Sequence, residues 1–190
     1  MYSLIFSGPA FCSKLRTDMP YLYDPAIDDD LDAELRALLC LCFPGTMFER
    51  KRYNAELPAH RWILQDSFGR IVAHVAAHDK RIGLPDGETR AGGIAEVCVH
   101  PDHRGQGHVK RLMHEAHDWM RQENIPFSIL VGEMRVYGSQ GYRPATNPLR
   151  FFDVPVRRWV TRPCDYFLVL PLGGQAWPET GAVDLRGPLF

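Results

Sequence analysis

The sequence has no long apolar run, no excess of either charge and no C-x-x-C cysteine pair. No apolar stretch approaches the roughly 18–20 residues of a membrane-spanning helix. The first residues, MYSLIFSGPAFCSKL, are mildly apolar but carry no basic residue ahead of the apolar stretch, which makes a poor signal peptide. The formal net charge of -1 argues against broad binding to nucleic acid or to an anionic membrane. We therefore expect neither nucleic acid nor a membrane as a partner.

The cysteine content indicates free thiols. The chain has 5 cysteines, an odd number, and no C-x-x-C pair occurs. Cys40 and Cys42 lie in a helical pattern and Cys98 in a strand pattern, so reduced thiols in the cytoplasm are the simplest interpretation. The length of 190 residues and 45% hydrophobic content fit one domain with a substantial core. Because no internal repeat or low-complexity tract interrupts it, we expect residues 1–190 to form a single domain.

Hydrophobic periodicity predicts an alternation of helices and strands. Residues 28–43 place leucines at helical spacing behind aspartates that suit a helix N-terminus. Residues 61–100 read as an antiparallel meander of three strands, and residues 46–60 as loop or a short helix. The order indicates a mixed α/β sheet with helices on its faces, whereas the Gly- and Pro-rich tail, residues 173–190, shows no clear element. The expected strands are 61–66, 70–82, 89–100, 125–132, 149–154 and 165–172, and the expected helices are 28–43, 106–123 and 133–141.

The segment VCVHPDHRGQGHV, residues 97–109, has the features of an anion-binding turn. Pro101 cannot donate to a strand ladder, so pairing should end there. The RGQG turn then opens a helix, whose first N–H groups and positive dipole end attract an anion. Its glycines let a phosphate approach the backbone, and Arg104 adds charge. A pyrophosphate is the ligand that best fits these features, although a glycine-rich helix cap without a ligand explains this short pattern equally well.

The wider pattern indicates a family. A Walker turn needs a GK[ST] ending, which is absent, and a dinucleotide-binding G-x-G-x-x-G fails because its last position is Lys110. Instead, V-x-V-x-P-x-x-R-G-x-G followed by an amphipathic helix resembles the core motif of the GNAT superfamily of N-acetyltransferases. Downstream, VYGSQGYRP resembles the xYxxxGF helix and turn of that superfamily, with a strand between the two motifs. The resemblance covers residues 60–145 as an acetyl-CoA-binding core, and residues 146–190 would add C-terminal strands and the tail.

The resemblance implies a fold and a co-substrate. The fold would be a mixed, mostly antiparallel, twisted sheet flanked by helices and splayed between the strand at 89–100 and the strand at 125–131. Acetyl-CoA would pair its pantetheine arm with the backbone of Val97, Cys98 and Val99. Its pyrophosphate would lie on the turn, where Val109 replaces the small residue that the family prefers. The implied turn residues are Arg104, Gly105, Gln106, Gly107, His108 and Val109.

Acetyl transfer to an amine requires a base for the amine, an N–H for the oxyanion and an acid for the departing thiolate. Tyr137 matches the tyrosine that acts as the acid in many GNAT enzymes, although a core aromatic packing on CoA is the alternative. Glu96, beside the V-x-V strand, is the best candidate base. Its alternatives are balancing a nearby arginine or binding a cationic substrate. His100 is a weaker base candidate, and Cys98 lacks a partner for covalent catalysis.

The histidines do not form a recognisable metal site. His114 and His117 are neighbours at i, i+3 spacing, and His108 lies nearly two turns earlier. No cysteine or carboxylate pattern completes a zinc site, so we expect a solvated helix face and no metal. His74 and His78 share a strand face, where they either line an acceptor pocket or are ordinary polar sheet positions.

The acceptor is least constrained by the sequence. GRIVAHVAAHDKRI together with the turn is similar to aminoglycoside 2′-N-acetyltransferases, but the substrate-binding glutamate of those enzymes corresponds here to Ala95. We expect a small-molecule primary amine, aminoglycoside-like or polyamine-like, and a homodimer is compatible with the sequence. A non-catalytic CoA-binding module is the alternative, against which Tyr137 and Glu96 argue. Acidic groups around a cationic acceptor would come from Glu96, Glu133, Asp184 and the terminal carboxylate of Phe190.

Overall fold

The computed structural model describes residues 21–190, so the N-terminal segment judged above to be a poor signal peptide, and Cys12 within it, lie outside the described residues. None of the helices within residues 21–190 is long and apolar enough to cross a membrane. In chain order the elements are β1 (Tyr21–Tyr23), α1 (Asp29–Cys42), β2 (His60–Gln65), β3 (Ile71–Leu84), β4 (Gly87–Val99), α2 (His108–Gln122), β5 (Phe127–Val131), α3 (Met134–Tyr137), β6 (Arg143–Pro144), β7 (Leu149–Asp153), β8 (Arg158–Arg162), β9 (Phe167–Pro171) and β10 (Val183–Pro188).

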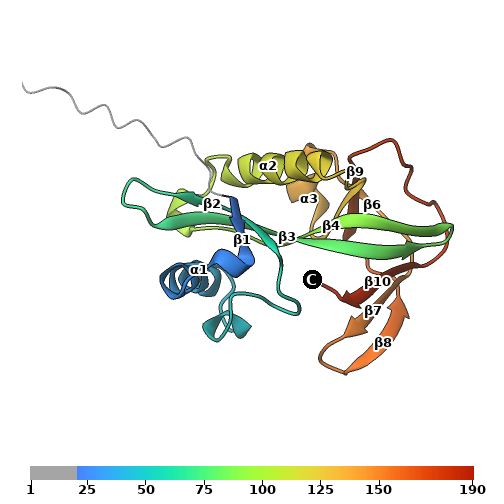
Figure 1. The fold of residues 1–190 in the computed structure, drawn as a ribbon, viewed down its shortest axis with the longest axis horizontal. Coiled ribbons are helices and arrows are strands. Elements are labelled where there is room, and N and C mark those ends of the chain that lie inside the picture. Colours follow the sequence, from blue (N-terminus) through green and yellow to red (C-terminus); the bar gives the residue numbers. More distant parts are fainter. Residues whose placement is uncertain (1–20) are drawn as a thin grey trace, which may run out of the picture.

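One 10-stranded sheet runs through the described chain in the order β6-β9-β5-β4-β3-β10-β7-β8, with β2 and β1 branching from β3 (Figure 1). The predicted meander is confirmed, because β2, β3 and β4 pair antiparallel. Among the strands of residues 21–190, only β4–β5 and β10–β7 are parallel pairs. The structure therefore has the mixed, mostly antiparallel α/β sheet expected from the sequence.

The helices α1 and α2 cover opposite faces of this sheet (Figure 1). At the start of α1, the Asp28 carboxylate accepts a hydrogen bond of 2.9 Å from the Leu31 amide, which is the predicted N-cap. Helix α1 ends at Cys42, shortly before Gly45, whose φ is 73°. Its buried leucines pack on Ile63 and Cys98 of the sheet.

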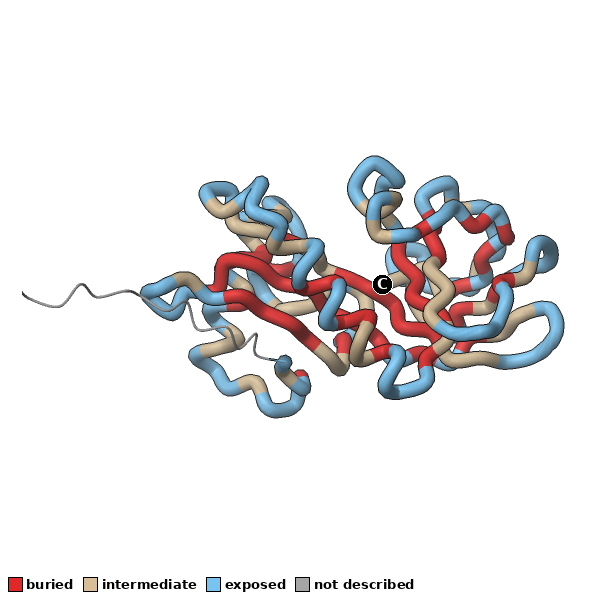
Figure 2. The backbone as a smooth tube through the Cα atoms, turned by 90° about the horizontal axis from the view of Figure 1, so that it is seen from above, coloured by how far each residue is buried: buried red, intermediate tan, exposed pale blue. Residues whose placement is uncertain are grey.

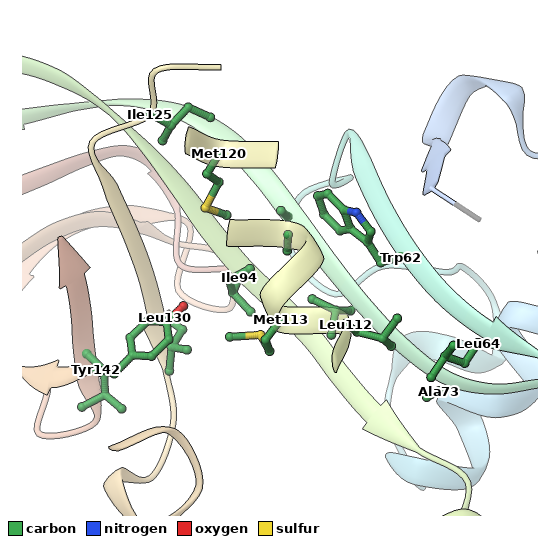
Figure 3. Packing of buried hydrophobic residues seen from close by; sticks show 14 of the residues in the cluster. Trp62, Leu64, Ala73, Ile94, Leu112, Met113, Met120, Ile125, Leu130 and Tyr142 are labelled. Carbon is green, nitrogen blue, oxygen red and sulfur yellow. The ribbon is translucent and has the colours of Figure 1, made fainter. Parts of the chain in front are cut away.

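Helix α2 covers the other face with the apolar stripe predicted for it. Figure 3 shows Leu112, Met113 and Met120 packed against the sheet, with Trp62 and Ile94 contributed by the strands. All three residues of the helix are fully buried. The position and direction of the helix are therefore fixed by close packing over its whole length.

Strands β4 and β5 separate in the middle of the sheet. Their parallel pairing extends from Gly92 opposite Ser128 to Ile94 opposite Leu130, and β4 then continues to Val99 paired with β3 alone. A β-bulge accompanies the separation, because the β3–β4 register shifts beside Glu96, whose φ is 54°. A bulge bends its strand and increases the local twist. The splay between these two strands, predicted above, is thereby confirmed.

The expectation of a structureless C-terminal tail was wrong. Strand β10 lies between β3 and β7, with Val183 and Leu185 fully buried and Asp184 between them. The apolar alternation is only three residues long and is followed by Gly187, which makes the local strand signal weak. The edge strand β8 was also not predicted, since it is largely exposed. The chain then ends near the middle of the molecule, beside the buried strands (Figure 2).

Candidate active site

A cavity of about 600 Å³ opens where β4 and β5 have separated. Its wall combines the end of α1, the end of β4, the following turn, the start of α2 and the short helix α3. The structure thus brings together all the residues that were predicted to bind the co-substrate: Val97, Cys98, Val99, Arg104, Gly105, Gln106, Gly107, His108 and Val109. Tyr137 joins them, and further lining residues that were not predicted are Cys42, Phe43, His103, Lys110, Arg135 and Val136.

The turn before α2 offers unpaired amides to this cavity. Gly105 and Gly107 both have a φ of 76°, a left-handed conformation that strongly favours glycine. The first helical hydrogen bond runs from the Arg111 amide to the Gly107 carbonyl oxygen, at 3.1 Å. The amides of residues 108–110 therefore precede the helical ladder, and Gly107 has no side chain that could cap them. Such a helix start fits an anion.

Cationic side chains complete this end of the cavity. The Arg104 Nε donates to the Val99 carbonyl oxygen at 3.3 Å, which ties the turn to the end of β4. Lys110 and Arg135 line the same cavity from α2 and α3. Unpaired amides together with these cations form a donor set that suits a diphosphate. The arrangement therefore fits the CoA moiety that the sequence implied.

Tyr137 lies on the β5 side of the opening, as the last residue of α3. Its ring packs on Gly132, where an added Cβ would lie 2.5 Å from the Tyr137 Cε2. The Tyr142 ring contacts it edge-on at a centroid distance of 6.0 Å. Burial raises the pKa of the Tyr137 hydroxyl above its usual value near 10. The phenol therefore remains protonated at neutral pH, as a proton donor must be.

Glu96 lies at the bulge in β4 but is not one of the residues that line the cavity. Its carboxylate accepts hydrogen bonds from Arg61 Nη1 at 2.9 Å and from the Asn54 amide at 3.0 Å, and its side chain is 5% exposed. Burial raises the pKa of Glu96, against the opposing effect of Arg61. The contact with Arg61 corresponds to the alternative role named above, and a base role for Glu96 stays a prediction.

A buried polar network around Arg61 was not predicted from the sequence. The Arg61 Nε donates to Asp24 Oδ1 at 2.6 Å, and its Nη1 lies 3.1 Å from His74 Nε2. His74 Nδ1 lies 2.9 Å from the Glu96 carbonyl oxygen. Burial, with the nearby Arg61, lowers the pKa of His74 to about 3, so its ring is neutral. A neutral ring that accepts from Arg61 and donates to Glu96 satisfies every contact and holds the bulge in place.

The second histidine of this strand face, His78, contacts the C-terminal residue. Its ring centroid lies 5.5 Å from that of Phe190. An added Cβ on Gly93 would lie 2.9 Å from Phe190 Cε1, so the terminal ring packs directly on β4 next to the separation. Phe190, whose terminal carboxylate was named above among the acidic groups around a cationic acceptor, is therefore close to the opening of the sheet.

The other proposed acidic groups have local partners. Asp184 accepts from Arg150 Nη1 at 2.6 Å, and Glu133 forms an ion pair with Arg135. Each of these two carboxylates is therefore neutralised by an arginine of its own.

His117 is not on a solvated helix face, which corrects the prediction made for it. Its side chain is buried, and its Nε2 lies 2.9 Å from the Tyr142 hydroxyl, which lies 2.6 Å from Ser128 Oγ. The reason is spacing, since residue 117 follows the buried Met113 by four positions and shares its face. His114 is exposed and pairs with Asp118 at 3.3 Å. Within residues 21–190 no group of three or more potential ligands could hold a metal ion.

Comparison with known proteins agrees with this geometry. Residues 23–145 match the acetyltransferase (GNAT) domain family. The GNAT family N-acetyltransferase YhbS from Escherichia coli, solved with CoA, has a TM-score of 0.65 at 19% identity over 95% of this chain and 93% of that chain. A GNAT family acetyltransferase from Brucella melitensis, solved with acetyl-CoA, has a TM-score of 0.58 at 17% identity over 87% and 94%. The ribosomal-protein-S18-alanine N-acetyltransferase from Escherichia coli has a TM-score of 0.53 at 13% identity over 83% and 96%. Among curated proteins no sequence matches.

Proposed function

Because the chain belongs to the GNAT family of acetyltransferases, and is thereby an acetyl-CoA-dependent acyltransferase, we propose that it acetylates a primary amine of a small molecule. One observation supports this most directly. A single cavity at the separation of β4 and β5 combines unpaired helix amides, cationic side chains and the partly buried phenol of Tyr137. The first two suit a phosphorylated carrier, and the third suits a leaving group that needs a proton.

Acetyl-CoA supplies an acetyl group activated as a thioester. In this chain the amides of residues 108–110 and Arg104 would bind its diphosphate. Beyond Ile94, β4 is paired with β3 on one edge only, so the other edge is available to an extended, amide-bearing arm. Val97, Cys98 and Val99 would hold that arm. The two binding surfaces are continuous along the cavity wall.

Tyr137 and Glu96 would carry out the two proton transfers of the reaction. Tyr137 is the proposed donor to the departing thiolate, because burial keeps its hydroxyl protonated. Glu96 is the proposed acceptor of the amine proton, directly or through a water. Burial brings its pKa above the usual carboxylate value and closer to neutrality, which improves a carboxylate as a base. Glu96 is buried against Arg61, so its ability to accept a proton depends on this arginine. Tyr137 depends less on a neighbouring charge.

The proposed acceptor is a small polyamine-like or aminoglycoside-like amine. The likeness of GRIVAHVAAHDKRI and the turn to aminoglycoside 2′-N-acetyltransferases favours it. His78 and Phe190, which pack together on β4 beside the opening, would form part of its surroundings. Cys40, Cys42, Cys98 and Cys164 are free thiols, which supports the proposed cytoplasmic location.

Thiol release from acetyl-CoA tests the proposal, measured against a panel of aminoglycosides, linear polyamines and amino acids. For an amine that is turned over, Tyr137→Phe should lower kcat by about 10²–10⁴-fold with little change in acetyl-CoA affinity. Gly107→Ala should weaken acetyl-CoA binding, because a Cβ is strained at a φ of 76°. Tight acetyl-CoA binding without thiol release across the panel would contradict an enzyme and favour a CoA-binding module.

A further inference from the structure

Two cysteines from distant parts of the chain meet at the wall of the cavity. Cys42 is the last residue of α1, and Cys98 lies in β4. Both line the cavity and belong to the same apolar cluster, and the Cys42 thiol donates a hydrogen bond of 3.4 Å to the carbonyl oxygen of Val99, the residue next to Cys98. Cys98 is 5% exposed, whereas Cys42 is half-buried and more accessible. The proposed acetyl transfer uses neither thiol.

The surroundings give the two thiols different reactivities. The Cys42 Sγ lies 3.4 Å from the Val99 carbonyl oxygen, to which Arg104 Nε also donates at 3.3 Å. The hydrogen bond from Cys98, together with Arg104, outweighs burial and lowers the pKa of the Cys42 thiol to about 7. The hydrogen bond with Cys42, and burial, raise the pKa of Cys98. Because the thiolate is the nucleophile, Cys42 is the attacking thiol and Cys98 the partner that reacts second.

We propose that Cys42 and Cys98 form a modification site for low-molecular-weight disulfides, and that the bond they form with each other limits acetyl-CoA binding. This inference rests on the proposed assignment of the cavity to acetyl-CoA. The pair is distinguished from the other described cysteines by its place in the cavity wall. Cys40 and Cys164 do not line the cavity.

The reaction is a thiol–disulfide exchange in two steps. The Cys42 thiolate attacks one sulfur of the small disulfide RSSR, the S–S bond breaks, and RS⁻ leaves and takes up a proton. Cys98 then releases its proton to solvent and attacks the Cys42 sulfur, which forms the Cys42–Cys98 bond and expels the second RS⁻. The protein loses two electrons and two protons, and RSSR is reduced to two RSH.

Closure of this bond should alter the cavity, because both sulfur atoms are part of its wall. A disulfide is only about 2.0 Å long, so its formation draws the end of α1 toward β4. Cys42 also loses the proton that it donates to Val99, the residue that anchors Arg104 and belongs to the proposed binding edge. We expect acetyl-CoA to bind about tenfold more weakly, which corresponds to the loss of about one good hydrogen bond. By reciprocity, bound acetyl-CoA should disfavour the disulfide.

The experiment uses the full chain, first reduced and desalted, then treated with oxidised glutathione at neutral pH. Peptide mapping by mass spectrometry follows the glutathione adducts and the disulfide, and calorimetry with desulfo-CoA, which has no thiol to reverse the reaction, measures binding. We expect a Cys42 adduct followed by the Cys42–Cys98 disulfide, reversed by dithiothreitol and slowed by desulfo-CoA. Cys98→Ser should stop at the adduct. The matched control Cys40→Ser, on the same helix, should behave like the parent protein.

Several outcomes would overturn the proposal. They are equal labelling of Cys40 and Cys42, a disulfide between other cysteines, or a Cys42–Cys98 disulfide that leaves the affinity for desulfo-CoA unchanged. Failure of the reduced protein to bind desulfo-CoA would overturn the assignment of the cavity and, with it, the effect on binding. The peptide map on the unsubstituted chain would still decide whether the two thiols form a reactive pair, so the two failures are distinguishable.

Discussion

Replacing Gly132 with alanine should displace Tyr137 and slow acetyl transfer while leaving acetyl-CoA binding nearly intact. An ideal Cβ on Gly132 lies 2.5 Å from Cε2 and 3.0 Å from Cδ2 of Tyr137, and 3.0 Å from Leu130 Cδ1. Carbon atoms normally pack at about 3.5–4.0 Å, so the ring must move by about 1 Å. Leu130 is 1% exposed and has little room to yield. Since a misplacement of about 1 Å at a reacting group can cost about 10²-fold, we expect kcat to fall by about 10- to 100-fold.

The measurement compares initial rates of thiol release with the dissociation constant of acetyl-CoA from calorimetry. Because overpacking lowers the free energy of unfolding by about 1–3 kcal/mol, circular dichroism must first show that the variant is folded at the assay temperature. Gly173→Ala is the matched control, since its added Cβ would lie at an ordinary 3.7 Å from Pro126. It should leave both quantities unchanged.

A double substitution tests whether Gly132→Ala acts through the Tyr137 hydroxyl. If Gly132→Ala acts by moving Tyr137, adding Tyr137→Phe to it should lower kcat much less than Tyr137→Phe does in the parent protein. An unchanged kcat in the folded Gly132→Ala variant would refute the reasoning. So would a loss of acetyl-CoA affinity as large as the loss of kcat, because the damage would then lie in the whole cavity.

The remaining predictions concern stability. Arg61→Met removes the ion pair of Glu96 and one of the two ion pairs of the buried Asp24, which keeps Arg52, and should lower the free energy of unfolding by about 3–5 kcal/mol in urea denaturation. Arg70→Met, which breaks a pair whose arginine is 72% exposed, should cost less than about 1 kcal/mol, and similar losses for both would contradict the argument. Burial is the main cause that lowers the pKa of His74 and His78 to about 3 and of His117 to about 4. In the unfolded chain these pKa values are near 6.5, so the unfolded state binds more protons below that pH. The free energy of unfolding should then fall as the pH drops from about 6.5 toward 4, by up to about 1.4 kcal/mol per pH unit for each histidine. Urea titrations across this range that show no such fall would contradict neutral, buried rings.

Much of the fold could be predicted because its signals are local. The stripe of α2, the N-cap of α1 and the alternating strands of the meander each lie within one continuous segment. The turn before α2 was predictable for the same reason, since its glycines, its arginine and the helix that follows are neighbours in the chain. Val183 and Leu185 gave too short an alternation to predict β10, whose pairing depends on strands far away in the sequence.

The parts of the site that could not be predicted depend on contacts between distant residues. Nothing near Glu96 in the sequence indicates that its carboxylate pairs with Arg61, or that Asp24 lies on the other side of that arginine. Likewise, Cys42 reaches the cavity only because α1 packs under β4. For His117 the helical spacing was a usable signal, but the polarity of the residue outweighed it.

The packing of α2 has a consequence for how the anion site is positioned. At the far end of this helix, Met120 lies against Gly92, where any side chain would overlap the buried methionine. Met120 follows His108 by 12 positions, which span about 18 Å at a rise of 1.5 Å per residue. The helix therefore acts as a rigid element. Its packing on the sheet at Met120 sets the position of the amides at the start of the helix, about 18 Å away. A larger residue at position 92 should therefore move the proposed phosphate site without touching it.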